Sequence, residues 1–374
     1  MKIAQIAPIW YSIPPKKYGG TEDVINHITE GLVKNRHDVT LFATGDSKTS
    51  AHLVSFFEKE LVTDTLPQGR EFFIYPYVHM VKSLEYIAKN NFDIVHCHYT
   101  TLADSILLGL VKNLKNCLFT IHSFFPEDTN PRWEVFKLFP HVPFVSISDR
   151  QRKGNLNFVK TIYHGLNLND YEFNDSSNIN LENEYMFWIS RVSPTKGLID
   201  ALKTSALTKK RLVFTATVNS DVDKKFYTEE VEPLLNNSLT VPIPELDMKK
   251  KNYYYQHARL FIFPIHWEEP FGLVLIESLV CGTPVVAYAR GSVPEIIKDG
   301  VTGFIVNESE ETKRGDWIIK KTGIEGLCEA VEKIYSMPKD EYEKMRKTCR
   351  DDVEKRFTVE RMVTDYEALY KTFL

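Results

Sequence analysis

The feature of this sequence that most constrains its fold is an alternation of short apolar segments with helical patterns, which occurs twice along the chain. In the first series, apolar residues recur at helical spacing after the first strand, and Thr21 is placed to cap that helix. Strands that alternate with helices predict a parallel, doubly wound sheet. The strands expected in this series are 2–7, 38–43, 93–96, 117–121 and 142–147, with further helical patterns at 78–89 and 101–114.

The second series follows a polar, turn-rich stretch, and its expected strands are 185–190, 211–217, 259–264 and 284–288. A chain of 374 residues is too long for one compact core, so two Rossmann-like α/β domains are expected. We place them at 1–168 and 184–356, with a linker at 169–183 and a C-terminal helix at 357–374 that packs back on the first domain. A ligand is expected in the cleft outside the carboxyl ends of the strands.

Composition excludes several classes of protein. The net charge of −4 offers no general attraction for nucleic acid. The five cysteines form no CxxC pair, so neither a disulfide framework nor a cysteine zinc site is expected. The N-terminus does not have the pattern of a secretion signal, and no run approaches the roughly 18 apolar residues of a membrane span. We therefore expect a cytoplasmic protein whose membrane contact is at most peripheral.

The most informative segment is 264–277, PIHWEEPFGLVLIE, in which a strand ends, a loop follows and a helix begins near Leu273. Unpaired backbone N–H groups and the positive dipole at such a start can hold a diphosphate. Glu269 and Glu277 bracket the start, so one carboxylate can lie beside a sugar and the other can accept hydrogen bonds from a ribose diol. The alternative is that both are solvated charges, which the apolar run around Glu277 disfavours. Glu268 is expected to be an exposed neighbour.

This segment resembles the E-x7-E signature of retaining glycosyltransferases of the GT-B architecture, family 4, also called glycosyl transferases group 1. The runs 281–287, 291–297 and 300–304 continue the family pattern, and the similarity extends over most of the chain. The resemblance implies an N-terminal acceptor domain and a C-terminal domain for a nucleotide-sugar donor. It also implies that the donor contacts the helix start, namely Phe271, Gly272, Leu273 and Val274.

Two cations follow the first strand of the second series. Arg191 and Lys196 stand in the run SRVSPTKG, where an Arg fork and a Lys point charge suit a diphosphate whose departing charge must be stabilised. In the family that the chain resembles, such a pair holds the donor phosphates. The family often has Gly where this chain has Ser190, a departure that leaves both cations in place. The alternative is a surface pair on a loop.

The first domain offers a second group of candidates. Gly19 and Gly20 let the backbone approach a ligand closely just before a helix start, although a Gly-Gly pair is usually only a turn. In related enzymes this loop lies near the donor phosphate and acceptor, and a histidine placed like His122 contacts the donor sugar. His122 is otherwise a strand-end histidine bonded to backbone, and His164 is expected to shape the hinge. The loop 14–22 and the segment 39–47 are similar to family-4 proteins described as UDP-glucose:tetrahydrobiopterin glucosyltransferases.

Three short patterns are weighed and set aside. His96-Cys97-His98 would make a metal site only with a third ligand from elsewhere, so strand-end packing is the better interpretation. Asp221-Val222-Asp223 imitates a DxD motif but lies in a polar loop without the matching fold context. Lys249-Lys250-Lys251 is expected to be a solvated run of charge. No metal and no cofactor are therefore expected.

The resulting hypothesis is a retaining, metal-independent hexosyltransferase that uses a UDP- or GDP-sugar. Its catalytic residues would be His122, Arg191, Lys196 and Glu269, and Glu277 would complete the donor site together with Gly19 and Gly20. The acceptor is unknown and could be a glycan, a lipid-linked sugar or a small molecule. The alternatives are another sugar-nucleotide enzyme on the same scaffold, such as an epimerase or a phosphorylase, and a non-catalytic sugar-nucleotide-binding subunit.

Overall fold

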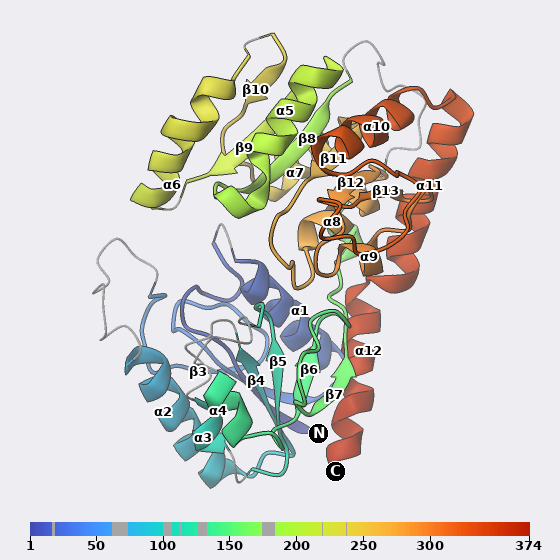
Figure 1. Ribbon diagram of the computed structural model, residues 1–374. Helices are drawn as coiled ribbons and strands as arrows, with labels where there is room; N and C mark the ends of the chain where they lie inside the picture. The colour runs from blue at the N-terminus through green and yellow to red at the C-terminus, as the bar shows by residue number, and fades with distance from the viewer. Residues whose placement is uncertain are drawn as a thin grey trace. The chain divides into compact units, whose positions relative to one another are not determined.

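The computed structural model describes residues 1–374 except 17–18, 62–73, 100–106, 112–113, 126–132, 174–183, 219 and 237. The chain forms two compact units, each built around its own parallel sheet (Figure 1). The first unit contains Met1–Gly165 together with Val359–Leu374, and the second contains Leu166–Thr358. The described part of the predicted linker, residues 169–173, belongs to the second unit, where Tyr171 is buried.

The first unit contains a sheet of seven strands in the order β3-β2-β1-β4-β5-β6-β7, in which each neighbouring pair is parallel. Its central strands are apolar and buried, as strands covered on both faces must be. The strands are β1 (Lys2–Ile6), β2 (Asp38–Phe42), β3 (His52–Val54), β4 (Ile94–Tyr99), β5 (Cys117–Ile121), β6 (Phe144–Ser146) and β7 (Phe158–Thr161). The helices are α1 (Gly20–Lys34), α2 (Ile74–Asn90), α3 (Leu108–Val111) and α4 (Trp133–Leu138).

The expected strands of the first series are all present, with ends that shift by a few residues. The prediction for Thr21 is wrong, because α1 begins at Gly20 and its N-cap, Gly19, forms no side-chain capping bond. Of the expected helix at 101–114, residues 108–111 form α3, whereas 101–106 and 112–113 lie outside the described residues. The strands β3 and β7 were not expected from the sequence.

The second unit contains six parallel strands in the order β10-β9-β8-β11-β12-β13. Helices α5 and α10 pack on one face of the sheet, while α8 packs on the other face between α7 and α11 (Figure 1). The strands are β8 (Met186–Arg191), β9 (Leu212–Thr217), β10 (Thr240–Pro242), β11 (Leu260–Phe263), β12 (Val285–Tyr288) and β13 (Gly303–Val306). The helices are α5 (Leu198–Thr208), α6 (Asp221–Phe226), α7 (Met248–His257), α8 (Leu273–Val280), α9 (Val293–Ile296), α10 (Gly323–Tyr335) and α11 (Lys339–Arg356).

This strand order defines where a ligand can bind in the second unit. The chain runs outward from β8 to β10 in one direction and from β11 to β13 in the other, so the order reverses between the neighbours β8 and β11. In open α/β sheets the crevice at such a reversal, outside the carboxyl ends of the strands, is the usual ligand site. The loops that follow β8 and β11 carry the predicted donor residues.

The C-terminal helix α12 (Val359–Tyr370) belongs to the first unit and packs along α1. Its apolar residues, Met362, Val363, Tyr366, Leu369 and Tyr370, are buried as the helical spacing requires. Gly31 of α1 lies against Val363, and a Cβ added there would stand 2.5 Å from Cγ2 of that valine. The two helices therefore approach each other closely because α1 has no side chain at this position.

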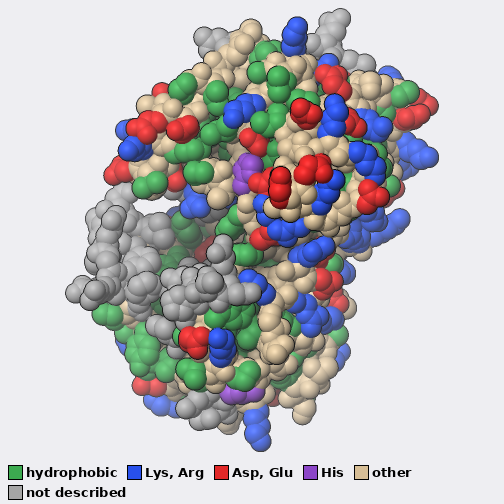
Figure 2. Space-filling model, viewed as in Figure 1, with side chains coloured by type: hydrophobic (Ala, Val, Ile, Leu, Met, Phe, Trp, Pro, Cys, Tyr) green, Lys and Arg blue, Asp and Glu red, His purple; other side chains and the backbone are tan. Residues whose placement is uncertain are grey.

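Charged side chains of both signs are interspersed over the face of the second unit seen in Figure 2, so no large basic surface gathers there. This agrees with the net charge of −4. Among the helices that the structure describes, none combines the length and the apolar character that a bilayer-spanning segment requires.

We predict that Gly31→Ala destabilises the protein, although alanine favours a helix by about 1 kcal/mol over glycine. The added methyl group overlaps Val363, and overpacking of this kind costs about 1–3 kcal/mol. Urea unfolding measures the free energy of unfolding of each variant. The effect of Gly31→Ala is compared in the parent protein and in Val363→Ala, where the valine methyl groups are absent. Adding Gly31→Ala to Val363→Ala should be neutral or stabilising. A stabilising effect of Gly31→Ala alone would contradict the packing of α12 on α1.

Candidate functional site

The loops after β8 and β11 are joined at the carboxyl edge of the second sheet. The backbone N–H of His266 donates to the carbonyl of Thr195 over 2.9 Å, and the Trp188 indole donates to the carbonyl of Lys196 over 3.2 Å. Gly197 has a φ of 76°, and a Cβ at this residue would overlap the carbonyl oxygen of Pro264. Only glycine fits such a position, so the local sequence Lys196-Gly197 brings the lysine up against the loop after β11.

Lys196 and Glu269 meet in this loop pair. Lys196 Nζ lies 3.1 Å from Glu269 Oε2, and the two side chains are 15% and 12% exposed. The Trp267 indole N–H donates to the same carboxylate oxygen over 2.9 Å. Lys196 Nζ lies over the indole ring, 4.4 Å from the ring centroid. The structure therefore brings together two of the predicted residues and adds Trp267, which stands two positions before the glutamate in the sequence.

The loop after β12 fixes the backbone on which Glu269 stands. Ser292 N donates to the Glu269 carbonyl over 2.9 Å, and Ser292 Oγ donates to the Phe271 carbonyl over 2.6 Å. Gly291 has a φ of 51°, and a Cβ there would overlap the backbone of Glu269. Three loops of the second unit thus hold Glu269 in place before any ligand arrives.

Glu268 is not the exposed neighbour that the sequence predicts. Its carboxylate accepts the backbone N–H of Gly291 over 2.8 Å and pairs with Arg290 over 3.0 Å and with Arg314. Burial acts to raise the pKa of Glu268, but these hydrogen bonds and charges outweigh it and lower the pKa. The side chain is 26% exposed and serves to hold the loop.

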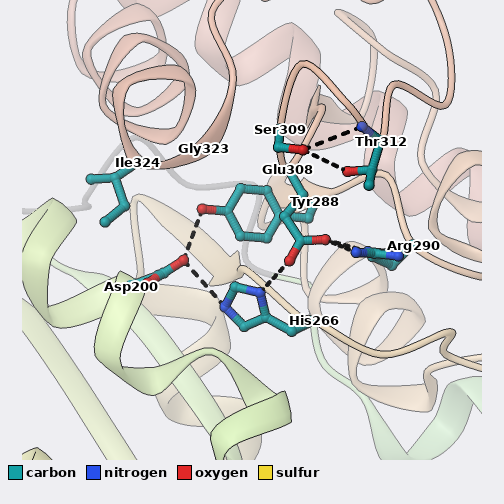
Figure 3. A pocket seen from close by; sticks show the side chains of 9 residues that line it. All are labelled: Asp200, His266, Tyr288, Arg290, Glu308, Ser309, Thr312, Gly323 and Ile324. Carbon is teal, nitrogen blue, oxygen red and sulfur yellow. Dashed lines mark hydrogen bonds and ion pairs between the residues drawn. The ribbon is translucent and has the colours of Figure 1, made fainter.

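A hollow of about 440 Å³ lies beside this loop, on the side of α5 and α10 (Figure 3). His266 stands in it between two carboxylates, 3.2 Å from Asp200 and 2.6 Å from Glu308. The hydrogen bond to Asp200 raises the pKa of His266, burial opposes this, and Glu308 raises it further. Glu308 also pairs with Arg290, so acidic and basic side chains alternate from Asp200 to Glu268.

The predicted helix start is the start of α8. Gly272, its N-cap, has a φ of 82° and no side chain that could cap the helix, and among the described residues no side chain is bonded to the first-turn N–H groups. Leu273 and Val274 are half-buried there, and Phe271 is buried with its ring 5.9 Å from that of Phe357. Such a start offers amide hydrogens and a positive dipole to an anion.

Glu277 is buried, one turn into α8, with its side chain 9% exposed. Its Oε1 accepts from Lys251 Nζ over 2.6 Å, and the hydroxyls of Tyr171 and Tyr255 each lie 3.4 Å from its carboxylate. The prediction that residues 249–251 form a solvated run is therefore wrong for Lys251, which is 17% exposed. Tyr255 stands four positions after Lys251 in α7, and this spacing is the signal that could have identified the buried lysine.

Arg191 is not bonded to this cluster in the part of the chain that the structure describes. It is the last residue of β8 and is exposed, and within the described residues it forms no ion pair. Asp221 and Asp223 lie in the first turn of α6, where Ser220 Oγ caps the helix by accepting from Asp223 N. No group of three or more potential metal ligands occurs in the part of the chain that the structure describes.

The candidates of the first unit form a separate group. Gly19 and Gly20 stand at the start of α1, where a Cβ on Gly19 would lie 2.7 Å from Cβ of Pro15 and 3.0 Å from Glu22 Oε2. Glu22 is 4% exposed in the first turn of this helix. The loop is therefore closely packed, and its backbone comes near a buried carboxyl group that the sequence analysis did not single out.

His122 follows β5 and contacts two other histidines. Its Nε2 lies 3.0 Å from Nδ1 of His98, and its ring stacks on that of His164 with 5.2 Å between centroids. The rings of His96 and His98 lie on the same face of β4, 4.1 Å apart. Burial lowers the pKa of His122 to about 3 and holds the pKa of the other three well below the ordinary value. All four imidazoles are therefore uncharged near neutral pH.

Two doubly wound parallel sheets are the architecture of the GT-B fold, which the solved structures similar to this chain share. Residues 170–352 match the family model "Glycosyl transferases group 1", and residues 18–156 match "Glycosyltransferase Family 4". The chain belongs to this family of glycosyltransferases.

Similar proteins share this architecture at low sequence identity. An "uncharacterized 41.2 kDa protein in cps region" of Klebsiella pneumoniae is 24% identical over 95% of this chain and 97% of its own length. Sucrose-phosphate synthase from Thermosynechococcus elongatus superposes with a TM-score of 0.78 at 19% identity, over 100% of this chain and 99% of that one. The Anabaena protein Alr3699/HepE, solved with UDP and glucose, gives a TM-score of 0.71 at 15% identity, over 100% of both chains. These structures show the shared fold.

We predict that Glu22→Gln changes stability in a pH-dependent way. Burial raises the pKa of Glu22 from 4.5 to about 7, its own backbone N–H opposes this, and Glu60 raises it further. The pKa of Glu22 is higher in the folded protein than in the unfolded chain, so the protonated side chain favours folding. This contribution to the free energy of unfolding is complete below about pH 4.5 and is lost as the pH rises towards 7. A shift of this size corresponds to about 3 kcal/mol at most.

Thermal unfolding of the variant and the parent at pH 5 and pH 8 measures this effect. Glu22→Gln should gain stability relative to the parent as the pH rises, whereas Glu85→Gln, at an exposed position, should not. A difference between Glu22→Gln and the parent that is the same at both pH values would contradict the assignment.

Proposed function

We propose that this chain is a retaining hexosyltransferase that uses a nucleoside-diphosphate sugar, preferably a UDP- or GDP-sugar, and a hydroxyl acceptor. The observation that carries the proposal is the Lys196–Glu269 pair beside the uncapped start of α8. A diphosphate needs fixed positive charge and amide donors, and a hexose beside it needs a carboxylate that accepts from its hydroxyls. The second unit supplies all three: the ammonium group of Lys196, the first-turn amides of α8 and the carboxylate of Glu269.

The donor would be held as follows. Lys196 and the first-turn amides of α8 would bind the diphosphate, and Arg191, free of ion pairs within the described residues, would reach the phosphates from the end of β8. Glu269, bonded to Lys196 and Trp267, would accept hydrogen bonds from the hexose. Glu277, paired with Lys251, would accept hydrogen bonds from the ribose diol. The UDP and glucose bound to the Anabaena protein support a ligand of this class.

In the reaction, the bond between the anomeric carbon and the diphosphate breaks as the acceptor oxygen attacks from the same face. The acceptor's proton passes to the departing phosphate oxygen, and the cations stabilise the charge that develops there. No carboxylate needs to act as a covalent nucleophile in this scheme, unlike in retaining glycosidases. The acceptor would enter at the first unit, near Gly19, Gly20 and His122.

An assay of nucleotide release by the purified protein tests the proposal, using UDP-, GDP- and ADP-sugars without an acceptor and with pooled hydroxyl acceptors. Release from one donor, with the product sugar retaining the anomeric configuration, is the expected result. Binding of a nucleotide sugar without any release would favour a binding subunit, and an altered sugar still attached to its nucleotide would favour an epimerase. Thermal shifts with UDP, GDP and ADP identify the base, because a ligand bound by the native state raises its melting temperature.

We predict that Lys196→Ala and Arg191→Ala each lower turnover about 100-fold or more, because each removes a charge that stabilises the leaving diphosphate. Arg191 is exposed, so its variant should fold normally and report on chemistry alone. Lys250→Ala is the matched control, since Lys250 is 69% exposed and pairs with Asp247 at a distance of 3.8 Å. Equal turnover by Arg191→Ala and the parent would remove Arg191 from the proposed site.

We predict that EDTA leaves turnover unchanged. In the proposed mechanism fixed cations and helix amides stabilise the diphosphate, so the reaction requires no divalent ion. Rates are compared before and after dialysis against chelator, with magnesium and manganese added back. Loss of activity in EDTA that either metal restores would contradict metal independence and leave the rest of the donor site to be tested separately.

A further inference from the structure

A continuous path of hydrogen bonds in the first unit connects the C-terminal helix to His122. Gln5 Nε2 donates to the Tyr370 hydroxyl over 3.1 Å, and Gln5 Oε1 lies 2.6 Å from His98 Nε2. His98 Nδ1 in turn lies 3.0 Å from His122 Nε2. Gln5, His98 and Tyr370 are buried, and none of them was expected from the sequence to act on the site.

With the Gln5 amide oriented as in the structure, the hydrogen bonds of the path have one direction. Gln5 Oε1 can only accept, so the hydrogen between Gln5 and His98 belongs to His98 Nε2. A neutral imidazole has one N–H, so His98 Nδ1 is an acceptor and His122 Nε2 must carry the hydrogen between the two rings. His122 Nδ1 is then left without a hydrogen, as a hydrogen-bond acceptor.

The hydroxyl of Tyr370 bonds the other end of the glutamine amide. Because it accepts from Gln5 Nε2, its own hydrogen points to His96 Nδ1, which lies 2.7 Å away. A branch continues from there, since His96 Nε2 lies 2.7 Å from Thr120 Oγ1 and Thr120 Oγ1 lies 2.9 Å from the Tyr366 hydroxyl. If the Gln5 amide were turned over, each hydrogen on the path to His122 would move to the other partner, and His122 Nδ1 would become a donor.

The end of the path is an unsatisfied acceptor. Within the described part of the chain, His122 Nδ1 is shielded from solvent and has no hydrogen-bond partner, although the ring as a whole is partly exposed. Buried polar atoms are nearly always bonded, so a missing partner at a candidate site points to a ligand group. Since burial keeps His122 uncharged, that ligand group is a donor such as a hydroxyl and not an anion that needs a positive imidazolium.

We propose that Gln5, His98 and Tyr370 are positioning residues that hold His122 in the Nε2–H tautomer, so that its Nδ1 accepts a hydrogen bond from a hydroxyl of a bound sugar. The C-terminal helix thereby acts on the reaction from inside the first unit, because Tyr370 bonds the Gln5 amide and the orientation of that amide sets the tautomers of both imidazoles. The part concerning the sugar rests on the proposed function, whereas the tautomer is a property of the protein alone.

The test is ¹⁵N NMR of the full chain labelled at histidine, in which protonated and unprotonated ring nitrogens have distinct chemical shifts. The chain has eleven histidines, so spectra of His122→Asn and His98→Asn assign the two rings by the signals that they lose. We expect His122 Nδ1 to be unprotonated in the parent protein. In Tyr370→Phe, where Gln5 Nε2 loses its acceptor, we expect a second form in which His122 Nδ1 is protonated.

Tyr366→Phe is the matched control. It removes a hydroxyl of equal burial from the same helix, but from the branch and not from the path to His122. Its spectrum should keep the parent tautomer. Gln5→Met is a second variant, because it removes both bonds of the amide and should also release the tautomer. A His122 that carries its proton on Nδ1 in the parent, or a tautomer unchanged in both Tyr370→Phe and Gln5→Met, would overturn the proposal.

Turnover gives an independent readout. Tyr370→Phe should lower kcat about 10-fold, with Tyr366→Phe within about twofold of the parent, the size typical of a positioning partner that acts through another residue. If the sugar hydroxyl belongs to the donor, hydrolysis of the donor without an acceptor falls as well; if it belongs to the acceptor, only transfer falls. A parent protein that releases no nucleotide would refute the proposed function, yet its NMR spectrum would still decide the tautomer.

Discussion

The ion pair between Lys196 and Glu269 is the interaction on which the second unit's site depends. Its two side chains are 15% and 12% exposed, a setting in which the attraction roughly offsets the cost of removing both charges from water. A pair of this kind is a poor device for stability, so its presence at the reversal point of the sheet favours a functional explanation. Gly197 and Gly291 permit the close loop approaches that hold it, and the Trp267 ring covers the ammonium group.

The polar groups of the two candidate sites differ in charge. In the second unit, acidic and basic side chains alternate from Asp200 through His266 and Glu308 to Arg290 and Glu268. The first unit instead buries four imidazoles that burial keeps neutral. Fixed charge suits a diphosphate, whose own charge grows as it leaves. Neutral rings with fixed tautomers suit hydroxyl groups, which must be oriented without being ionised.

The sequence predicts the central parts of both sheets and much of the second unit's site, because apolar periodicity and the E-x7-E spacing are local signals. The four strands that it does not reveal, β3, β7, β10 and β13, all lie at sheet edges and have three or four residues each. Such strands are too short for a clear period. The errors at Glu268 and Lys251 have another cause, since their partners Arg314 and Glu277 stand 46 and 26 residues away and no local pattern links them. The path from Tyr370 to Gln5 spans 365 residues and depends on how α12 packs.

The measurement that tests this account most directly is a crystal structure with the nucleoside diphosphate that gives the largest thermal shift. The account predicts that the diphosphate lies against Lys196 and the first turn of α8, with the ribose hydroxyls on Glu277. A nucleotide bound away from Lys196 and Glu277, for example in the hollow between Asp200 and Glu308, would contradict it.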